Sequence, residues 1–92
     1  MTSFVVVDLT PTDPEKIQEY SAAAGPTIAQ YNGEFVAKGE IESLNGGAHR
    51  QMKVIIQFPD REAALNWYTS DDYQALIPVR DQGMDATFHL VG

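Results

Sequence analysis

The feature that most limits the fold of this chain is a pair of short, almost continuously apolar segments, FVVVDL at residues 4–9 and MKVIIQF at residues 52–58. Both are rich in valine and isoleucine, whose branched side chains favour extended backbone. An unbroken apolar run of this length is typical of a strand that is covered on both faces. The sequence therefore predicts a sheet with these two strands in its middle.

Turn signals divide the rest of the chain into further strands. Asn45-Gly46-Gly47 tolerates positive φ and separates two extended segments, which predicts a β-hairpin. The expected strands are residues 3–9, 34–44, 49–58 and 85–91.

A helix is predicted between the first two strands. Asp13 can cap its first turn, and Pro14 suits the first helical position. The apolar stripe fits a period of 3.6 residues and resumes in phase after Pro26, so we expect one kinked helix that ends at Asn32-Gly33 with the glycine in the left-handed conformation. The stripe consists of Ile17, Tyr20, Ser21, Ala24, Ile28 and Tyr31.

A second helical region follows Pro59-Asp60 and is expected in two pieces. The first runs to about residue 69. Ser70 then has the features of a new N-cap, because two aspartates follow it where the helix dipole favours negative charge. We expect the second piece to reach Gln82 and to stop at Gly83.

These elements give the order β-α-β-β-α-β in a single domain, residues 1–92. Right-handed crossovers turn this order into an α+β, ferredoxin-like fold, with a four-stranded antiparallel sheet and the helices on one face. Its outer strands carry Lys38, Gly39, Glu40 and His89, as exposed edges should.

The pattern also indicates a homodimer. On the helix-covered face we place Phe35, Ala37, Met52, Val54, Ile56, Phe58, Phe88 and Leu90. The opposite face is not cleanly polar, since Val36, Ile55 and Val91 alternate there with Lys38, Lys53, Gln57, Thr87 and His89. In this register Lys38 and His89 lie near each other. The face projects on the order of 300 Å², below the roughly 800 Å² of a standard interface, so loops, an edge strand or the carboxyl terminus must also take part.

Charge excludes several kinds of partner. The net charge is −7, with six Lys and Arg against thirteen Asp and Glu. The basic residues are scattered, so neither nucleic acid nor an anionic membrane is an expected partner. Cysteine is absent, which excludes thiol chemistry, and the apolar amino-terminal run is too short for a signal peptide or a membrane span. We expect a cytoplasmic protein.

Arg80 is the most informative candidate for a binding site. It follows Tyr73, Leu76 and Ile77 on one apolar stripe at helical spacing. Burial of an unpaired guanidinium costs several kcal/mol. Arg80 must therefore reach water along its stem, as a cation in a last helical turn often does, or meet an anion or hydrogen-bond acceptors. Pro78 in the same segment leaves the carbonyl of Gln74 without its helical donor.

The aromatic residues have two interpretations. Trp67, Tyr68, Tyr73 and Tyr31 are at helical spacings typical of core residues, which is the favoured interpretation; in the alternative they form the walls of a cavity between helices and sheet. His49 and His89 could each move a proton near neutral pH, although neither has a partner motif. No histidine spacing predicts a metal site, and no phosphate loop, dinucleotide fingerprint or serine-hydrolase elbow is present, so we expect neither a metal nor a cofactor.

The segment FPDREAALNWYTSDDYQAL with the later Arg80 resembles the domain-of-unknown-function family 1330, of the dimeric α+β barrel superfamily. The matching positions are Phe58, Pro59, Glu62, Ala63, Trp67, Tyr68, Ser70, Asp72, Tyr73, Gln74 and Arg80. VVVDLTPTDPEKIQEY, Pro26 and YNGEFVAKG extend the resemblance over nearly the whole chain. Lys38 stands where the family often has arginine, Glu40 where a second glycine is common, and Asp71 where proline is frequent. The resemblance implies a homodimer, supplies no catalytic residues, and suggests a small-ligand pocket by analogy with cofactor-free enzymes of the superfamily.

Two hypotheses of function follow. In the first, the protein binds a small organic molecule, as a binding protein or a cofactor-independent enzyme. Its candidate pocket residues are Arg80, Trp67, Tyr68, Tyr73, Tyr31, His89 and Lys38. In the second, it is a non-enzymatic module that associates only with itself or with another protein, and Arg80→Ala would then change stability or dimerisation but no ligand affinity.

Overall fold

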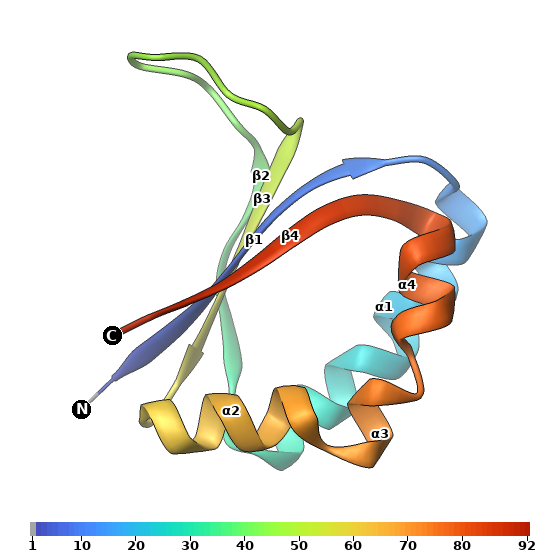
Figure 1. Cartoon of the computed structure of the whole chain (residues 1–92), viewed down its shortest axis with the longest axis vertical. Coiled ribbons are helices and arrows are strands. Elements are labelled where there is room, and N and C mark those ends of the chain that lie inside the picture. The colour runs from blue at the N-terminus through green and yellow to red at the C-terminus, as the bar shows by residue number, and fades with distance from the viewer. Residues whose placement is uncertain (1) are drawn as a thin grey trace.

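The computed structural model describes residues 2–92 and has the predicted order of strands and helices (Figure 1). The elements are β1 (Ser3–Pro11), α1 (Pro14–Gln30), β2 (Glu34–Glu40), β3 (Met52–Phe58), α2 (Arg61–Thr69), α3 (Asp71–Gln74), α4 (Ile77–Gly83) and β4 (Met84–Val91). None of the helices in this range is long and apolar enough to cross a membrane.

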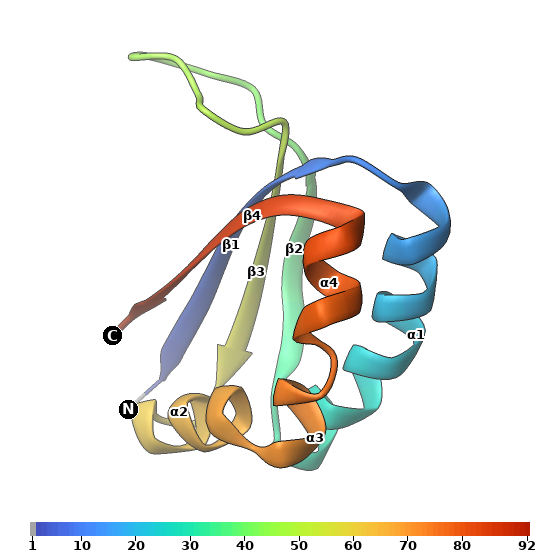
Figure 2. The same ribbon diagram turned by 45° about the vertical axis from the view of Figure 1, so that its right-hand side comes forward.

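The four strands form one antiparallel sheet in the order β2-β3-β1-β4. The two apolar strands, β1 and β3, therefore lie in the middle, as predicted. All four helices lie on the same side of the sheet, and no helix in residues 2–92 covers the other face (Figures 1 and 2). The predicted ferredoxin-like α+β fold is confirmed.

The core lies between this sheet and the helix layer. Trp67, Tyr73 and Phe58 are fully buried. The ring of Trp67 lies 5.4 Å from that of Phe58 and 4.3 Å from that of Tyr73, which joins α2, β3 and α3. Close contacts between large aromatic side chains supply much of the apolar burial that a short chain needs.

The predicted helix starts are confirmed. The carboxylate of Asp13 accepts hydrogen bonds from the amides of Glu15 and Lys16, Asp60 caps α2, and the Ser70 hydroxyl accepts from the amide of Tyr73. Such contacts satisfy amides that have no partner within the helix. The helix α1 continues through Pro26 as one element, also as predicted.

The end of α1 differs from the prediction at one residue. Asn32, with φ of 63°, takes the left-handed conformation that was assigned to Gly33. Asparagine tolerates this conformation better than other residues with a side chain. Position 33 requires a glycine for a steric reason instead, because a Cβ atom there would lie 2.6 Å from the Phe58 ring.

Two predicted strands are shorter in the structure, and one predicted helix is divided. The strand β2 ends at Glu40 and its partner β3 begins at Met52. The residues between them form the arm of the hairpin, which has little strand pairing. The third helical segment is divided at residues 75 and 76, and Pro78 lies in the first turn of α4 rather than in a helix interior. Pro78 is favoured there because the first amides of a helix have no partner to lose.

Gly83 is the last residue of α4 and marks the helix end that was predicted. Its carbonyl accepts hydrogen bonds from the amides of Thr12 and Asp13, 2.8 and 3.1 Å away. A Cβ atom at this position would lie 2.9 Å from the backbone nitrogen of Ile17. The close approach of α4 to the start of α1 therefore requires a glycine.

A β-bulge in β2 overturns part of the predicted register. Phe35 pairs with Ile56, but Ala37 pairs with Ile55, so Val36 is the extra residue. A bulge reverses the alternation of side chains beyond it. Ala37 therefore lies on the uncovered face, and Lys38, opposite Val54, lies on the helix-covered face.

The prediction that Lys38 and His89 lie close together is wrong. Lys38 is on β2 and His89 on β4, at opposite edges of the sheet. His89 also pairs with Val6, on the face away from the helices. The order of strands separates the two residues, and the bulge then places their side chains on different faces.

Candidate functional site

Arg80 is held among aromatic side chains. Its side chain is only 11% exposed. The Nη1 atom lies 3.2 Å from the hydroxyl of Tyr68 and 3.1 Å from that of Tyr73, and Nε bonds the exposed carboxylate of Asp81 at 3.0 Å. The guanidinium carbon lies 4.6 Å from the centre of the Phe88 ring, a cation–π contact. Hydrogen-bond acceptors of the protein thus partner the Nε and Nη1 atoms of the buried charge.

A further tyrosine extends this network. The hydroxyl of Tyr20, on α1, lies 2.7 Å from that of Tyr73. We call Tyr20, Tyr68, Tyr73 and Arg80 the tyrosine–arginine cluster. Tyr20 had no place among the candidate site residues, because only its position in an apolar stripe marked it and its partner is 53 positions away in sequence.

The environment keeps the cluster in fixed protonation states. Burial raises the pKa of Tyr20, and the neighbouring Tyr73 raises it further. Burial also raises the pKa of Tyr73, against the opposing effect of its hydrogen bonds to Tyr20 and Arg80. Burial alone would lower the pKa of Arg80, but its bonds to Tyr68 and Tyr73 outweigh this and raise it. Both phenols are therefore neutral and the guanidinium charged at physiological pH.

An apolar cleft of about 290 Å³ lies between α1 and the sheet. Its polar side chains are Tyr20, Ser21 and Lys38. The remaining lining residues are Val7, Leu9, Pro11, Ile17, Ala24, Ile28, Phe35, Met52, Val54, Met84 and Phe88. We call this space the α1 cleft.

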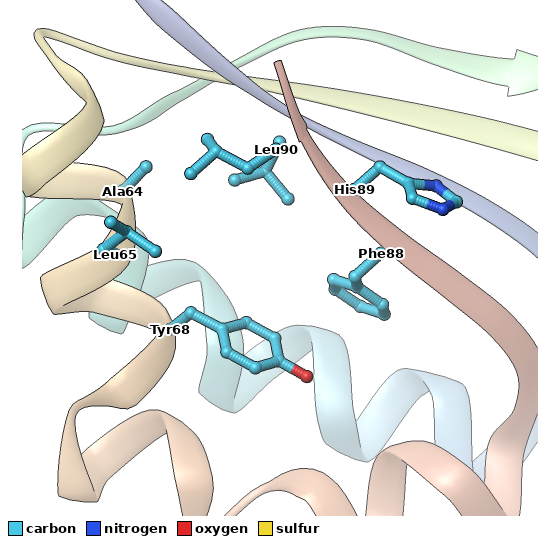
Figure 3. Close-up of a pocket in the computed structure, with 7 residues that line it drawn as sticks. Ala64, Leu65, Tyr68, Phe88, His89 and Leu90 are labelled. Atoms are coloured by element: carbon cyan, nitrogen blue, oxygen red, sulfur yellow. The ribbon is translucent and has the colours of Figure 1, made fainter. Parts of the chain in front are cut away.

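A second hollow, of about 210 Å³, lies beside α2 and is called here the α2 hollow. Val5, Ala64, Leu65, Tyr68, Phe88, His89 and Leu90 line it. Tyr68 and Phe88 face each other across it, whereas the imidazole of His89 points away from the other labelled side chains (Figure 3). Phe88 borders both spaces, and each space also has one tyrosine of the tyrosine–arginine cluster in its wall.

The other predicted residues lie outside these two spaces. Trp67 is fully buried and its Nε1 donates to the Thr27 hydroxyl at 3.1 Å, so it fills the core. Tyr31 is half-buried and packs against the core. His49, in the hairpin, borders a separate hollow on the uncovered face with His89, Asp8, Arg50 and Lys53. Residues 2–92 contain no group of three His, Cys, Asp or Glu side chains that could hold a metal ion.

Comparison with known proteins gives a family and a fold. The model of a family described as "Domain of unknown function (DUF1330)" matches residues 2–92. No curated protein matches the sequence.

Several solved structures are similar in fold. Protein RPA0582 of Rhodopseudomonas palustris, of unknown function, has a TM-score of 0.78 at 17% identity over 98% of this chain and 80% of that one. SnoaB of Streptomyces nogalater, a cofactor-independent oxygenase, has a TM-score of 0.71 at 13% identity over 99% and 91%. A dimeric ferredoxin-like protein of unknown function from Jannaschia sp. CCS1 has a TM-score of 0.68 at 16% identity over 97% and 98%.

Proposed function

The chain belongs to the DUF1330 family, and on that premise we propose that it is a homodimer that binds a small organic molecule in the α1 cleft. The observation that carries the proposal is an apolar space with few polar groups, one of which belongs to a buried hydrogen-bond network. Ligand sites in proteins commonly combine apolar walls with a small number of fixed polar groups.

The hydrogen-bond network favours Tyr20 as the donor to a ligand. A guanidinium can only donate, so the oxygen of Tyr73 accepts from Arg80. The proton of Tyr73 is then free for the oxygen of Tyr20, 2.7 Å away, and the proton of Tyr20 is free for an acceptor in the α1 cleft. Hydrogen bonds in such a chain polarise one another.

The volume of the cleft limits the size of the ligand. At about 290 Å³ it lies just below the roughly 300–1,000 Å³ of small-molecule sites, so only a small ligand fits. One or two rings, or an aliphatic body of similar size, suit this volume.

A reaction without a cofactor would use the same donor. Burial raises the pKa of Tyr20 and of Tyr73, so both phenols are donors rather than bases at neutral pH. A positioned donor stabilises negative charge that develops on a substrate oxygen. SnoaB, a cofactor-independent oxygenase, has a similar fold. This similarity supports such chemistry by analogy only.

Ligand titration followed by NMR tests the proposal. The panel consists of small aromatic and aliphatic compounds, with and without a carboxylate. Ser21→Trp fills the α1 cleft from an exposed position, and Leu65→Trp places the same side chain in the α2 hollow. We expect Ser21→Trp to abolish binding and Leu65→Trp to leave it unchanged.

Two results would overturn the proposed function. One is a panel in which no compound shifts any resonance of the wild-type protein. The other is binding that persists in Ser21→Trp and disappears in Leu65→Trp. The first result would favour the self-associating module as the function of the chain.

A further inference from the structure

Resting on the proposed function, we infer that the ligand of the α1 cleft is a monocarboxylate with an apolar body, and that Lys38 binds its carboxylate. The inference depends on where β2 places this lysine and on the charges around the cleft.

The β-bulge at Val36 puts Lys38 on the cleft side of the sheet. Without the extra residue, the alternation from Phe35 would direct Lys38 to the uncovered face. With it, Lys38 lies opposite Val54 and borders the cleft together with Phe35. Bulges often redirect a side chain beside a functional site.

Lys38 is the only charged residue among those that line the cleft. The chain has thirteen Asp and Glu side chains, yet none of them borders this space. Glu40 lies on the same side of β2 as Lys38, one pleat further along, and is not part of the lining. An acidic protein thus presents a local positive charge at the apolar α1 cleft.

The ammonium group of Lys38 has no carboxylate partner in residues 2–92. Arg50, Lys53 and Arg80 each lie within 4 Å of an aspartate, whereas the described contact of Lys38 is with the ring of Phe35, 5.7 Å from Nζ. A cation over an aromatic ring keeps its capacity to pair with an anion. Lys38 is also exposed, so it can reach an incoming ligand at little cost in desolvation.

Charge balance favours a monoanion over a phosphate. A single lysine compensates one negative charge, and no second cation lines the α1 cleft to pair with another. A carboxylate also accepts hydrogen bonds from a lysine without the planar fork of an arginine. The apolar body of the ligand would pack against Phe35 and Phe88, and a further oxygen would accept from Tyr20.

Three probes that share a benzyl group test the inference. They are phenylacetate, phenylacetamide and benzylphosphonate, titrated by NMR against the wild-type protein and three variants. Lys38→Met removes the charge, Lys38→Arg keeps it, and Lys53→Met removes a cation from the opposite face. We expect the wild type to prefer phenylacetate over phenylacetamide by about tenfold, typical of a charge-assisted hydrogen bond.

The variants separate the inference from the proposed function. We expect Lys38→Met to bind both compounds equally, and Lys38→Arg and Lys53→Met to keep the preference. Equal binding of phenylacetate and phenylacetamide by the wild type, or tighter binding of benzylphosphonate, would overturn the carboxylate assignment alone. If none of the three compounds nor any other compound of the panel binds, the proposed function itself is wrong.

Discussion

Arg80, on α4, donates hydrogen bonds to Tyr68 on α2 and to Tyr73 on α3, and so links three helices. Arg80→Met keeps an apolar stem over Phe88 and removes both hydrogen bonds to tyrosine oxygens. One hydrogen bond to a charged group contributes about 1.5–3 kcal/mol, and two bonds that share the Nη1 atom are not additive, so we expect a loss of roughly 2–4 kcal/mol in the free energy of unfolding. Urea denaturation at neutral pH measures it.

Asp81→Asn is the matched control for this prediction. It removes the exposed partner of Arg80 and leaves the tyrosine contacts in place. We expect a change of no more than about 1 kcal/mol, as for surface ion pairs. Equal effects of the two variants would show that the buried acceptors contribute nothing.

The buried phenols predict a loss of stability in alkali. Burial raises the pKa of Tyr20 and Tyr73 above the ordinary value of 10.0. The folded protein then keeps protons that the unfolded chain loses, so the stabilisation is complete below pH 10 and decreases as the pH rises above it. We expect the urea midpoint to fall between pH 9 and 11, and to fall less in the Tyr20→Phe/Tyr73→Phe double variant. A pH dependence unchanged by both substitutions would contradict this account.

The sequence predicted where Arg80 lies but not what it binds. Its spacing from Tyr73 and Ile77 is local, because residues three and seven positions apart share one face of a helix. The rest of the network is a different matter, since Tyr20 reaches Tyr73 only after α1 has packed against α3. No local pattern contains that contact.

At the scale of elements, the turn between α1 and β2 depends on close packing. Gly33→Ala would place a methyl group 2.6 Å from the ring of Phe58 and 2.7 Å from Ile28. Overpacking of a core costs typically about 1–3 kcal/mol. We expect Gly33→Ala to lower the free energy of unfolding by that amount.

Gly39→Ala provides the comparison for Gly33. A Cβ atom at Gly39 meets nothing within 4 Å, and its φ is not positive. We expect this variant to be as stable as the wild type or slightly more stable, because alanine restricts the unfolded chain. Thermal or urea denaturation of both variants decides the point, and equal losses would contradict the packing argument.

Elements with local causes were predicted well, and elements that depend on tertiary contacts were not. The caps at Asp13, Asp60 and Ser70 involve neighbours within three residues, so the sequence contains them. The bulge at Val36 depends on how β2 pairs with β3, and no glycine or proline marks it. For this reason the sequence pattern placed Lys38 on the wrong face of the sheet. The further inference depends on this residue.

At the scale of the whole molecule, the sheet face without helices carries apolar side chains that lie outside the helix-covered core. Phe4, Val6, Ile55 and Val91 lie on it between polar side chains, and the arm of the β2–β3 hairpin leans away from the helices on that side (Figure 1). Two similar structures are described as dimeric ferredoxin-like proteins. The order of strands could be predicted because the two central strands are the most continuously apolar ones, and the apolar residues on the uncovered face predict a partner for it.

We expect the wild-type protein to sediment as a dimer at micromolar concentration. Ile55→Lys puts a charge in the middle of the uncovered face, opposite Val6 and Ala37. A charge buried without a partner in a sheet-to-sheet interface destabilises the dimer. This variant should therefore sediment as a monomer, with its fold intact by circular dichroism. Ala22→Lys, on the exposed side of α1, should remain dimeric. A single-subunit mass for the wild type would contradict the dimer, whereas the α1 cleft is lined within one subunit and its ligand tests would still apply.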